Sequence, residues 1–306
     1  MNRSDMIYDL STIWATVKEI FPYFDRLQFD WDEQYLCYLE KILHIEDEKD
    51  FHLLLTRFME SLNDGHTKYI PPKEFRAPNP YNNPDSPSCT FKDGILTIKL
   101  NEFMYDHSAY VKEMLESAPE TSLVRLDIRY NIGGNTHYAA KVAELFISGT
   151  FSGCQKWTQI RNAVETAGAS QLINCSEARI QQYISDGMTT PKAVSDAKSV
   201  VGHTKYKRYT DSFGNGDRKA MYEGPLHILI SKRTMSAAED FTAMFKSNHR
   251  GILIGEPTYG STGTPCMIPL RCGGHAQVVS VGYRLLDGTE FIGSGIMPDS
   301  LSDANS

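Results

Sequence analysis

The sequence lacks a long hydrophobic run and an excess of positive charge, and each absence excludes a class of protein. No apolar run reaches the roughly 18 residues that a membrane helix needs, and one of the longest, Leu226 to Ser231, contains His227. Acidic residues outnumber basic residues by 38 to 31, so the formal net charge is -7. Because no basic field is present to attract a phosphate backbone, we expect a peptide or small-molecule partner rather than a nucleic acid.

Zinc-site spacing and a secretory signal are also missing. None of the 6 cysteines belongs to a C-x-x-C pair, and we expect all of them to be reduced thiols, with no metal ion and no cofactor. The N-terminal residues lack the charged and apolar regions of a signal peptide. The chain as written is therefore expected in the cytoplasm, or in a secreted or periplasmic location if a native signal peptide has been removed.

The first part of the chain has the periodicity of amphipathic helices. Apolar residues recur at steps of three and four positions in three stretches that end near residues 20, 43 and 62. They predict a helical bundle over residues 1–70, in which Gly65 supplies the left-handed residue that follows the last helix. A proline-rich stretch then predicts an extended linker over residues 71–92.

From residue 93 onward, strand and helix patterns alternate. The expected strands are 95–100, 123–128, 226–231, 252–254 and 278–285, and the expected helices are 110–115, 138–147 and 237–245. This order predicts an α/β core with a largely parallel sheet, divided between residues 93–150 and 224–306. Residues 151–223 show no clean period. We interpret them as an insertion or lid over one end of the sheet, with a role in substrate choice or with none.

Candidate catalytic groups stand where two of the expected strands lead into helices. Gly133 and Gly134 follow the strand 123–128, where they can bring a backbone N–H close to a ligand or simply form a tight turn. Ser236 precedes the helix 237–245. With Glu239 it fits a capping box, which is a structural role, or its hydroxyl lies at the positive end of the helix beside the Ala237 N–H.

Several segments in this order resemble the tail-specific (C-terminal-processing) serine protease family, in its tricorn-like or retinoid-binding-protein-like branch. The segments read LNDGHT (62–67), DIRYNIGG (127–134), TMSAAEDF (234–241), GEPTYG (255–260) and GSGIMPD (293–299). The resemblance implies a crotonase-like (ClpP/crotonase) ββα core and peptide-bond hydrolysis by a serine nucleophile. The PDZ domain common in this family has no room here between the first segment and the core.

The resemblance also implies roles for individual residues. Ser236 corresponds to the nucleophile, and the N–H of Ala237 with that of Gly133 or Gly134 corresponds to the oxyanion hole. Glu239, Asp127 and Asp299 match family positions that we expect to be structural.

The sequence differs from the best-known branch of the family in the residue that would act as the general base. That branch has a lysine base after the GEPTYG segment, and here Ser261-Thr262-Gly263 follows without a lysine. His66 is therefore implied as the general base, as in the tricorn-like branch. In that branch a serine precedes the histidine, where this chain has Gly65, and a glutamate stands where this chain has Ile292. Glu290, two positions away, is the candidate orienting residue.

These observations predict a serine peptidase, either an endopeptidase or a C-terminal-processing-like hydrolase, that acts on peptide or protein substrates. One alternative is a noncatalytic protein that uses the same fold to bind a peptide or an apolar ligand. A second is an acyl-CoA enzyme, although none of the five segments is specific to CoA. The sequence predicts no oligomeric state.

Overall fold

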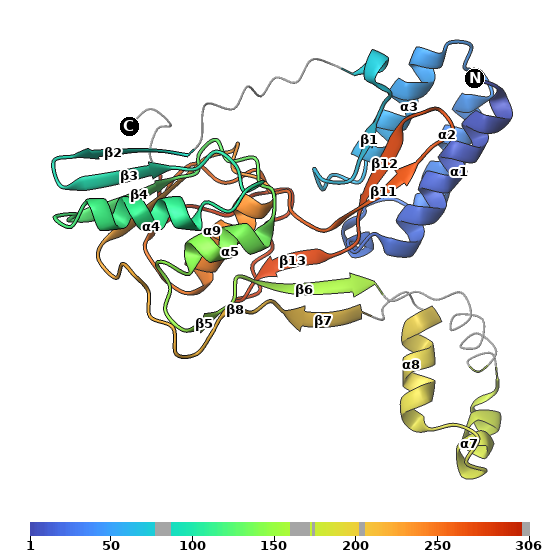
Figure 1. Cartoon of the computed structure of the whole chain (residues 1–306). Coiled ribbons are helices and arrows are strands. Elements are labelled where there is room, and N and C mark those ends of the chain that lie inside the picture. Colours follow the sequence, from blue (N-terminus) through green and yellow to red (C-terminus); the bar gives the residue numbers. More distant parts are fainter. Residues whose placement is uncertain (77–86, 160–171, 173–174, 202–205, 302–306) are drawn as a thin grey trace.

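The computed structural model describes residues 1–76, 87–159, 172, 175–201 and 206–301. The α-helices are α1 (Arg3–Ile20), α2 (Trp31–Ile42), α3 (Glu48–Glu60), α4 (Ser108–Ser117), α5 (Thr136–Ala143), α7 (Glu177–Ser185), α8 (Pro191–Val201) and α9 (Ala237–Ser247). The strands are β1 (Lys68–Ile70), β2 (Ser88–Lys92), β3 (Ile95–Lys99), β4 (Leu123–Asp127), β5 (Thr150–Phe151), β6 (Cys154–Gln159), β7 (Tyr206–Thr210), β8 (Phe213–Gly214), β9 (Leu226–Ile230), β10 (Ile252–Gly255), β11 (Pro265–Pro269), β12 (His275–Val279), β13 (Gly282–Leu285) and β14 (Ser300–Leu301). Short 3₁₀ helices cover Phe24–Arg26 and Lys73–Phe75. Together these elements form a mixed α/β fold (Figure 1).

A six-stranded sheet forms the centre of the α/β core, in the order β14-β10-β9-β4-β3-β2. All neighbouring pairs are parallel except β2 with β3, so the predicted largely parallel sheet is confirmed. Alternate side chains of β4 and β9, such as Leu126 and Ile228, are fully buried. Because parallel strands end at the same edge of a sheet, the segments that follow β4 and β9 meet at one edge, where ligands of such sheets bind.

Beyond residue 70, three parts of the chain differ from the expectation. The last part of the predicted linker is strand β2, which pairs with β3 across a turn in which Asp93 and Gly94 both have positive φ. Such a turn favours a hairpin, which the proline count of the segment does not reveal. Residues 77–86 of that linker lie outside the described residues. The predicted strand 278–285 is two strands, because the chain leaves β12 at Ser280 to bond Thr264 and then starts β13. The predicted helix 138–147 is α5, which starts and ends earlier.

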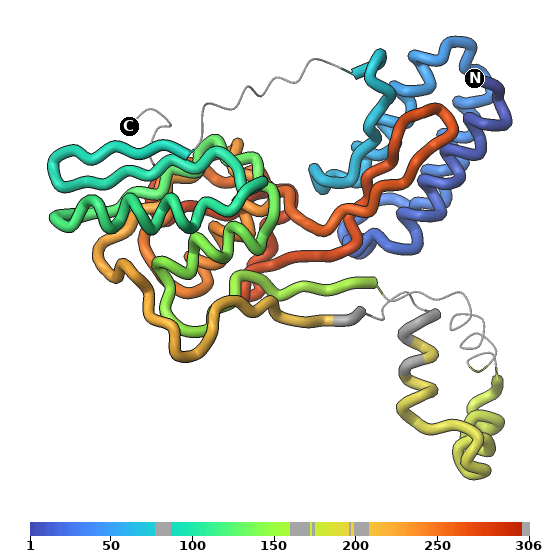
Figure 2. Tube along the Cα trace, in the orientation of Figure 1, coloured from blue at the N-terminus to red at the C-terminus, as the bar shows by residue number. Residues whose placement is uncertain are grey.

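The N-terminal helices are completed by a hairpin from the far end of the sequence. Strand β1 pairs antiparallel with β12, which pairs with β11, and α1 and α3 pack against this small sheet. The buried Asp9 carboxylate on α1 accepts the backbone N–H groups of Arg271 (2.8 Å) and Cys272 (2.9 Å). Figure 2 shows the red hairpin lying along the blue helices. The helical unit is therefore not formed by residues 1–70 alone.

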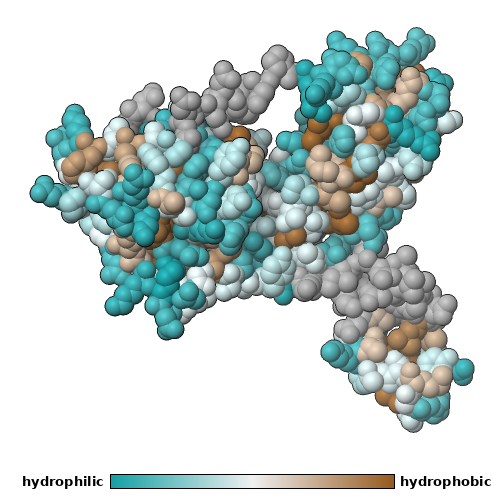
Figure 3. Space-filling view, viewed as in Figure 1, coloured by the Kyte–Doolittle hydropathy of each residue, from teal (hydrophilic) through white to brown (hydrophobic). Residues whose placement is uncertain are grey.

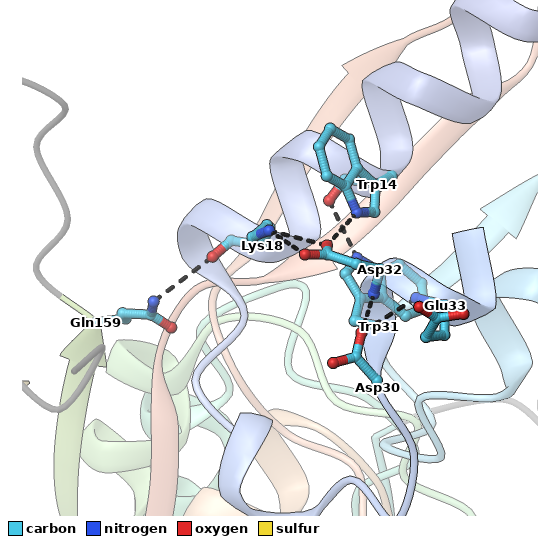
Figure 4. A network of polar contacts seen from close by, with 7 residues as sticks. All are labelled: Trp14, Lys18, Asp30, Trp31, Asp32, Glu33 and Gln159. Atoms are coloured by element: carbon cyan, nitrogen blue, oxygen red, sulfur yellow. Dashed lines mark hydrogen bonds and ion pairs between the residues drawn. The ribbon is translucent and has the colours of Figure 1, made fainter. Parts of the chain in front are cut away.

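A polar network fastens α1 to α2 and reaches the inserted segment (Figure 4). The Asp32 carboxylate accepts the Lys18 ammonium (2.6 Å) and the indole N–H of Trp14 (2.8 Å). The indole N–H of Trp31 donates to the Trp14 carbonyl at 3.1 Å. Gln159, the last residue of β6, donates to the Lys18 carbonyl at 3.5 Å. The insertion contacts the helical unit here and also at Trp157 of β6, whose indole N–H donates to the Pro22 carbonyl at 3.0 Å.

The inserted segment builds on the core through strands. β6 pairs with β13 on one side and with β7 on the other. In Figure 1, α7 and α8 lie beyond the far end of this hairpin and away from the central sheet, rather than over its end. Figure 3 shows hydrophilic residues over most of the visible face. None of the described helices has the length and hydrophobicity to cross a bilayer. The 6 cysteines are free thiols in the structure.

The side chain of Phe241 packs α9 against the core, and its replacement measures how much this packing contributes to the free energy of unfolding. Its fully buried ring lies 5.2 Å from the ring of Phe103 and 4.7 Å from that of Phe245. We expect Phe241→Ala to lower the free energy of unfolding by about 3–5 kcal/mol, because the removed ring leaves a cavity. A denaturant titration followed by circular dichroism measures this loss. Phe91→Ala is the control, since Phe91 on β2 is 50% exposed, and equal losses for both variants would contradict the prediction.

Candidate active site

Ser236 lies at a strained corner between β9 and α9. Its φ of 58° and ψ of -129° place a non-glycine residue in the left-handed half of the Ramachandran map, at a cost of about 1–3 kcal/mol. The side chain makes no capping bond, and the Ser236 N–H donates to the Ser261 carbonyl at 2.8 Å. The capping-box interpretation is therefore wrong. The half-buried hydroxyl is left at the N-terminal end of α9, on a sharp turn of the kind that exposes nucleophilic serines.

The glycine turn after β4 lies directly against Ser236. A Cβ atom on Gly133, whose φ is +95°, would lie 2.5 Å from the Ser236 Cβ and 2.9 Å from the Ala237 nitrogen. The Gly133 N–H donates to the side-chain oxygen of Asn131 at 2.9 Å, and the Asn131 amide donates to the Leu100 carbonyl at 3.1 Å. Only glycine allows this close approach, so the turn requires glycine at position 133 for steric reasons. The Gly133 N–H is also already bonded, to Asn131.

Two backbone N–H groups at this corner have no acceptor among the described residues. They belong to Gly134, which follows the engaged Gly133, and to Ala237, the first residue of α9. The position of Gly134 is fixed because Phe103 bonds the residues on either side of it, donating to the Gly133 carbonyl at 2.8 Å and accepting the Asn135 N–H at 2.9 Å. Backbone N–H groups that have no acceptor and lie beside a serine can donate to an oxyanion and stabilise it.

His66 is presented by a loop that the Asp64 carboxylate organises. That carboxylate accepts the backbone N–H of His66 at 2.8 Å, the backbone N–H of Thr67 and the Thr67 hydroxyl at 2.6 Å. On the other side, the Gln277 amide of β12 donates to the His66 carbonyl at 2.7 Å. The backbone on both sides of the imidazole is therefore held in place.

The helix before this loop ends earlier than predicted. α3 ends at Glu60, and Asn63, with a φ of 49°, is the left-handed residue that follows it, its N–H bonded to the Glu60 carbonyl at 3.1 Å. Asparagine tolerates this conformation better than other non-glycine residues, which the sequence expectation for Gly65 overlooked. Gly65 also has a positive φ, of 71°, but it shapes the loop that leads into His66.

The described structure brings the His66 and Ser236 segments together through one residue, Ser261. The Nδ1 atom of His66 lies 2.6 Å from the Ser261 hydroxyl oxygen, and the Ser261 carbonyl accepts the Ser236 N–H. Ser261 is only 1% exposed. In the sequence, this position differs from the best-known branch of the family only by the absence of a lysine. Its place immediately after the GEPTYG segment is the signal that could have identified it.

A buried carboxylate fixes the segment that contains Ser261. Glu239 on α9 accepts the Thr258 hydroxyl (2.5 Å) and the Gly260 N–H (2.7 Å) on one oxygen, and the Ser261 N–H (2.6 Å) on the other. Burial raises the pKa of Glu239 to about 7, although the three donors oppose this rise. Burial also raises the pKa of the neighbouring Asp240. Glu239 is thus structural, as expected, but it holds a loop and not the end of its own helix.

The electrostatic environment keeps the imidazole neutral. Burial, together with the smaller effect of the positive charge of Lys68, lowers the pKa of His66 to about 4. A neutral imidazole can accept a proton, which is the property required of a general base.

The candidate orienting residue predicted from sequence lies elsewhere. Glu290 is 53% exposed and forms an ion pair with Arg26 at 2.9 Å, so Ser261, and not Glu290, contacts the imidazole. Glu290 lies two positions from Ile292, in a loop whose path the sequence does not determine. The direction of its side chain therefore could not be predicted. Asp127 pairs with Arg129, and the Asp299 carboxylate pairs with Lys246 and accepts a backbone N–H of β10, which suits the structural roles expected of both.

Comparison with known proteins gives the family. The model of peptidase family S41 matches residues 94–302. Two curated relatives are the chloroplastic carboxyl-terminal-processing peptidases 2 and 1 of Arabidopsis thaliana. The first is 26% identical over 204 residues, or 62% of this chain, and the second 33% identical over 134 residues, or 43% of this chain. The aligned parts span only 39% and 27% of the two relatives.

Solved structures share the fold over nearly the whole chain. A putative peptidase from Parabacteroides merdae matches with a TM-score of 0.70 and 16% identity, covering 99% of this chain and 90% of its own. Mature CPAF matches with a TM-score of 0.69 and 12% identity, covering 98% and 94%. The photosystem II D1 C-terminal processing protease matches with a TM-score of 0.59 and 13% identity, covering 98% and 93%. Because the family match extends over more than half of the residues, the chain belongs to peptidase family S41.

Proposed function

We propose that this chain is a serine peptidase that hydrolyses peptide bonds in peptide or protein substrates, with Ser236 as the nucleophile and His66 as the general base. The observation that carries the proposal is the uncapped Ser236 hydroxyl at a strained strand-to-helix corner, in a segment bonded to the residue that contacts His66. Membership of family S41 and the C-terminal-processing peptidases among the relatives support it. For the core, we propose the crotonase-like ββα arrangement that the sequence predicts.

In the proposed acylation step, the Ser236 oxygen attacks the scissile carbonyl carbon while the Nε2 atom of His66 takes the hydroxyl proton. The tetrahedral intermediate collapses, the C–N bond breaks, and His66 returns the proton to the leaving amine. A water molecule, deprotonated by His66, then hydrolyses the ester on Ser236. The reaction needs no redox partner, and each proton removed is returned.

The oxyanion hole of this proposal consists of the N–H groups of Ala237 and Gly134. The sequence left the choice between Gly133 and Gly134 open, and the bond from the Gly133 N–H to Asn131 argues for Gly134. Two N–H donors near the nucleophile suit the charge that develops on the carbonyl oxygen. Gly133 then contributes the space between the turn and Ser236.

The role of Ser236 predicts the effect of its removal. Ser236→Ala should abolish hydrolysis of a fluorogenic peptide library and labelling by a fluorophosphonate probe, without lowering the melting temperature, because the side chain makes no cap bond. Ser117→Ala is a matched control, since this exposed serine ends α4, the helix that leads back to the start of β4 at the opposite edge of the sheet. Unchanged hydrolysis in Ser236→Ala would reject the nucleophile. A fold that binds peptide without any labelling would favour the noncatalytic alternative.

The low pKa of His66 predicts an acid-tolerant activity. The base must be neutral in the free enzyme, and burial disfavours its charged form, so the neutral form persists as the pH falls below the ordinary value of 6.5 toward about 4. The acid limb of a plot of kcat/KM against pH is therefore expected near pH 4, provided that circular dichroism shows a folded protein there. An acid limb at pH 6.5 or higher would show that His66 is not the buried base described.

The close approach of Gly133 predicts a steric effect on the site. Gly133→Ala should reduce kcat by about 100-fold or more, because its methyl group would displace Ser236 and the Ala237 N–H, and loss of one oxyanion donor alone costs that much. Gly187→Ala is the control for backbone strain, since Gly187 has a similar positive φ and no atom within 4 Å of its added Cβ. Equal activity in the two variants would contradict this geometry.

A further inference from the structure

We propose that Ser261 is the positioning residue of this active site, and that its hydroxyl accepts the Nδ1–H of His66 and leaves Nε2 free to take a proton. The inference rests on the proposed function, because it assigns the partner of the general base. It also differs from the sequence expectation, which named Glu290 as the candidate for that partner.

The atoms of Ser261 are fixed on three sides. Its N–H donates to Glu239 at 2.6 Å, its carbonyl accepts the Ser236 N–H at 2.8 Å, and its hydroxyl lies 2.6 Å from Nδ1 of His66. With both backbone groups bonded and the residue 1% exposed, the Ser261 side chain has little room to move. Ser261 therefore sets the position of the nucleophile's backbone and the orientation of the imidazole together.

Gly65 makes the contact sterically accessible. A Cβ atom on Gly65 would lie 2.9 Å from the Ser261 Cβ and 3.1 Å from its hydroxyl oxygen. Any side chain at position 65 would thus compete for the space that the Ser261 side chain occupies. The contact between Ser261 and His66 therefore requires both a serine at position 261 and a glycine at position 65.

Three carboxylates that could have been considered as partners of the imidazole are engaged elsewhere. Asp64 accepts the His66 N–H and the Thr67 hydroxyl of its own loop, Glu239 accepts three donors from the segment 258–261, and Glu290 pairs with Arg26. Within the described ranges, the Ser261 hydroxyl is the polar side-chain group bonded to the imidazole. Of the two neutral tautomers, only the one protonated on Nδ1 both donates to Ser261 and presents a lone pair at Nε2.

The first test reads the tautomer directly and needs no turnover. The chain is labelled with ¹⁵N-histidine, and the His66 signals are assigned by their loss in His66→Gln. Two-bond ¹H–¹⁵N spectra at pH 7 should show a protonated Nδ1 and an unprotonated Nε2 on His66. In Ser261→Ala the signals should move toward the Nε2–H tautomer, which histidine favours in water. A protonated Nε2 in the unmodified chain overturns the inference.

The second test measures kinetics. Ser261→Ala should lower kcat by about 10- to 100-fold with a smaller change in KM, because it removes the orientation of the base and leaves the substrate contacts in place. Ser261→Thr keeps a hydroxyl and should retain the Nδ1–H tautomer and most of kcat, and Ser117→Ala is the unrelated serine control. Unchanged kcat and tautomer in Ser261→Ala would overturn the inference.

The two proposals can fail separately. If the chain neither hydrolyses peptides nor labels with a fluorophosphonate, while the spectra show the Nδ1–H tautomer and its dependence on Ser261, the proposed function fails and the positioning contact stands. If hydrolysis depends on Ser236 and His66 but the tautomer is reversed, the function stands and the role of Ser261 is rejected.

Discussion

The whole site depends on the buried carboxylate of Glu239. Three donors from the segment 258–261 converge on it, and this segment in turn bonds the backbone of Ser236 and the side chain of His66. Because Glu239 lies on the first turn of α9, the same helix that starts after Ser236 also holds the loop whose Ser261 side chain contacts His66. An unpaired carboxylate at this depth would be costly, so the loop and the carboxylate stabilise each other.

The sequence predicted the elements of the core and the residues at its strand ends, because buried strands and amphipathic helices have recognisable periods. It did not predict the features that depend on contacts between residues far apart in the chain. The hairpin β11–β12 completes the N-terminal helices, which no local pattern of residues 1–70 reveals. Ser261 lies in an irregular segment, where a serine gives no local signal of a functional role. Its importance arises only because Gly65, nearly 200 positions earlier, leaves room for it.

The contrast between Ser236 and its capping-box pattern has the same origin. The sequence places serine and glutamate three residues apart at a helix start, which is typical of a reciprocal cap. In the structure both groups are bonded elsewhere, the serine N–H to Ser261 and the glutamate carboxylate to the loop. A local motif was thus replaced by tertiary contacts. The cost is a strained serine backbone, as is common where a residue serves chemistry rather than stability.

The pairing of β1 with β12 has a consequence for the synthesis of the protein. The His66 carbonyl is held by Gln277, and Thr67 accepts the N–H of Val279, so residues more than 200 positions downstream fix the loop that carries the imidazole. A chain emerging from the ribosome cannot assemble this loop until those residues have been translated. In a growing polypeptide the backbone around His66 therefore takes its final form only after residues 277–279 have been translated.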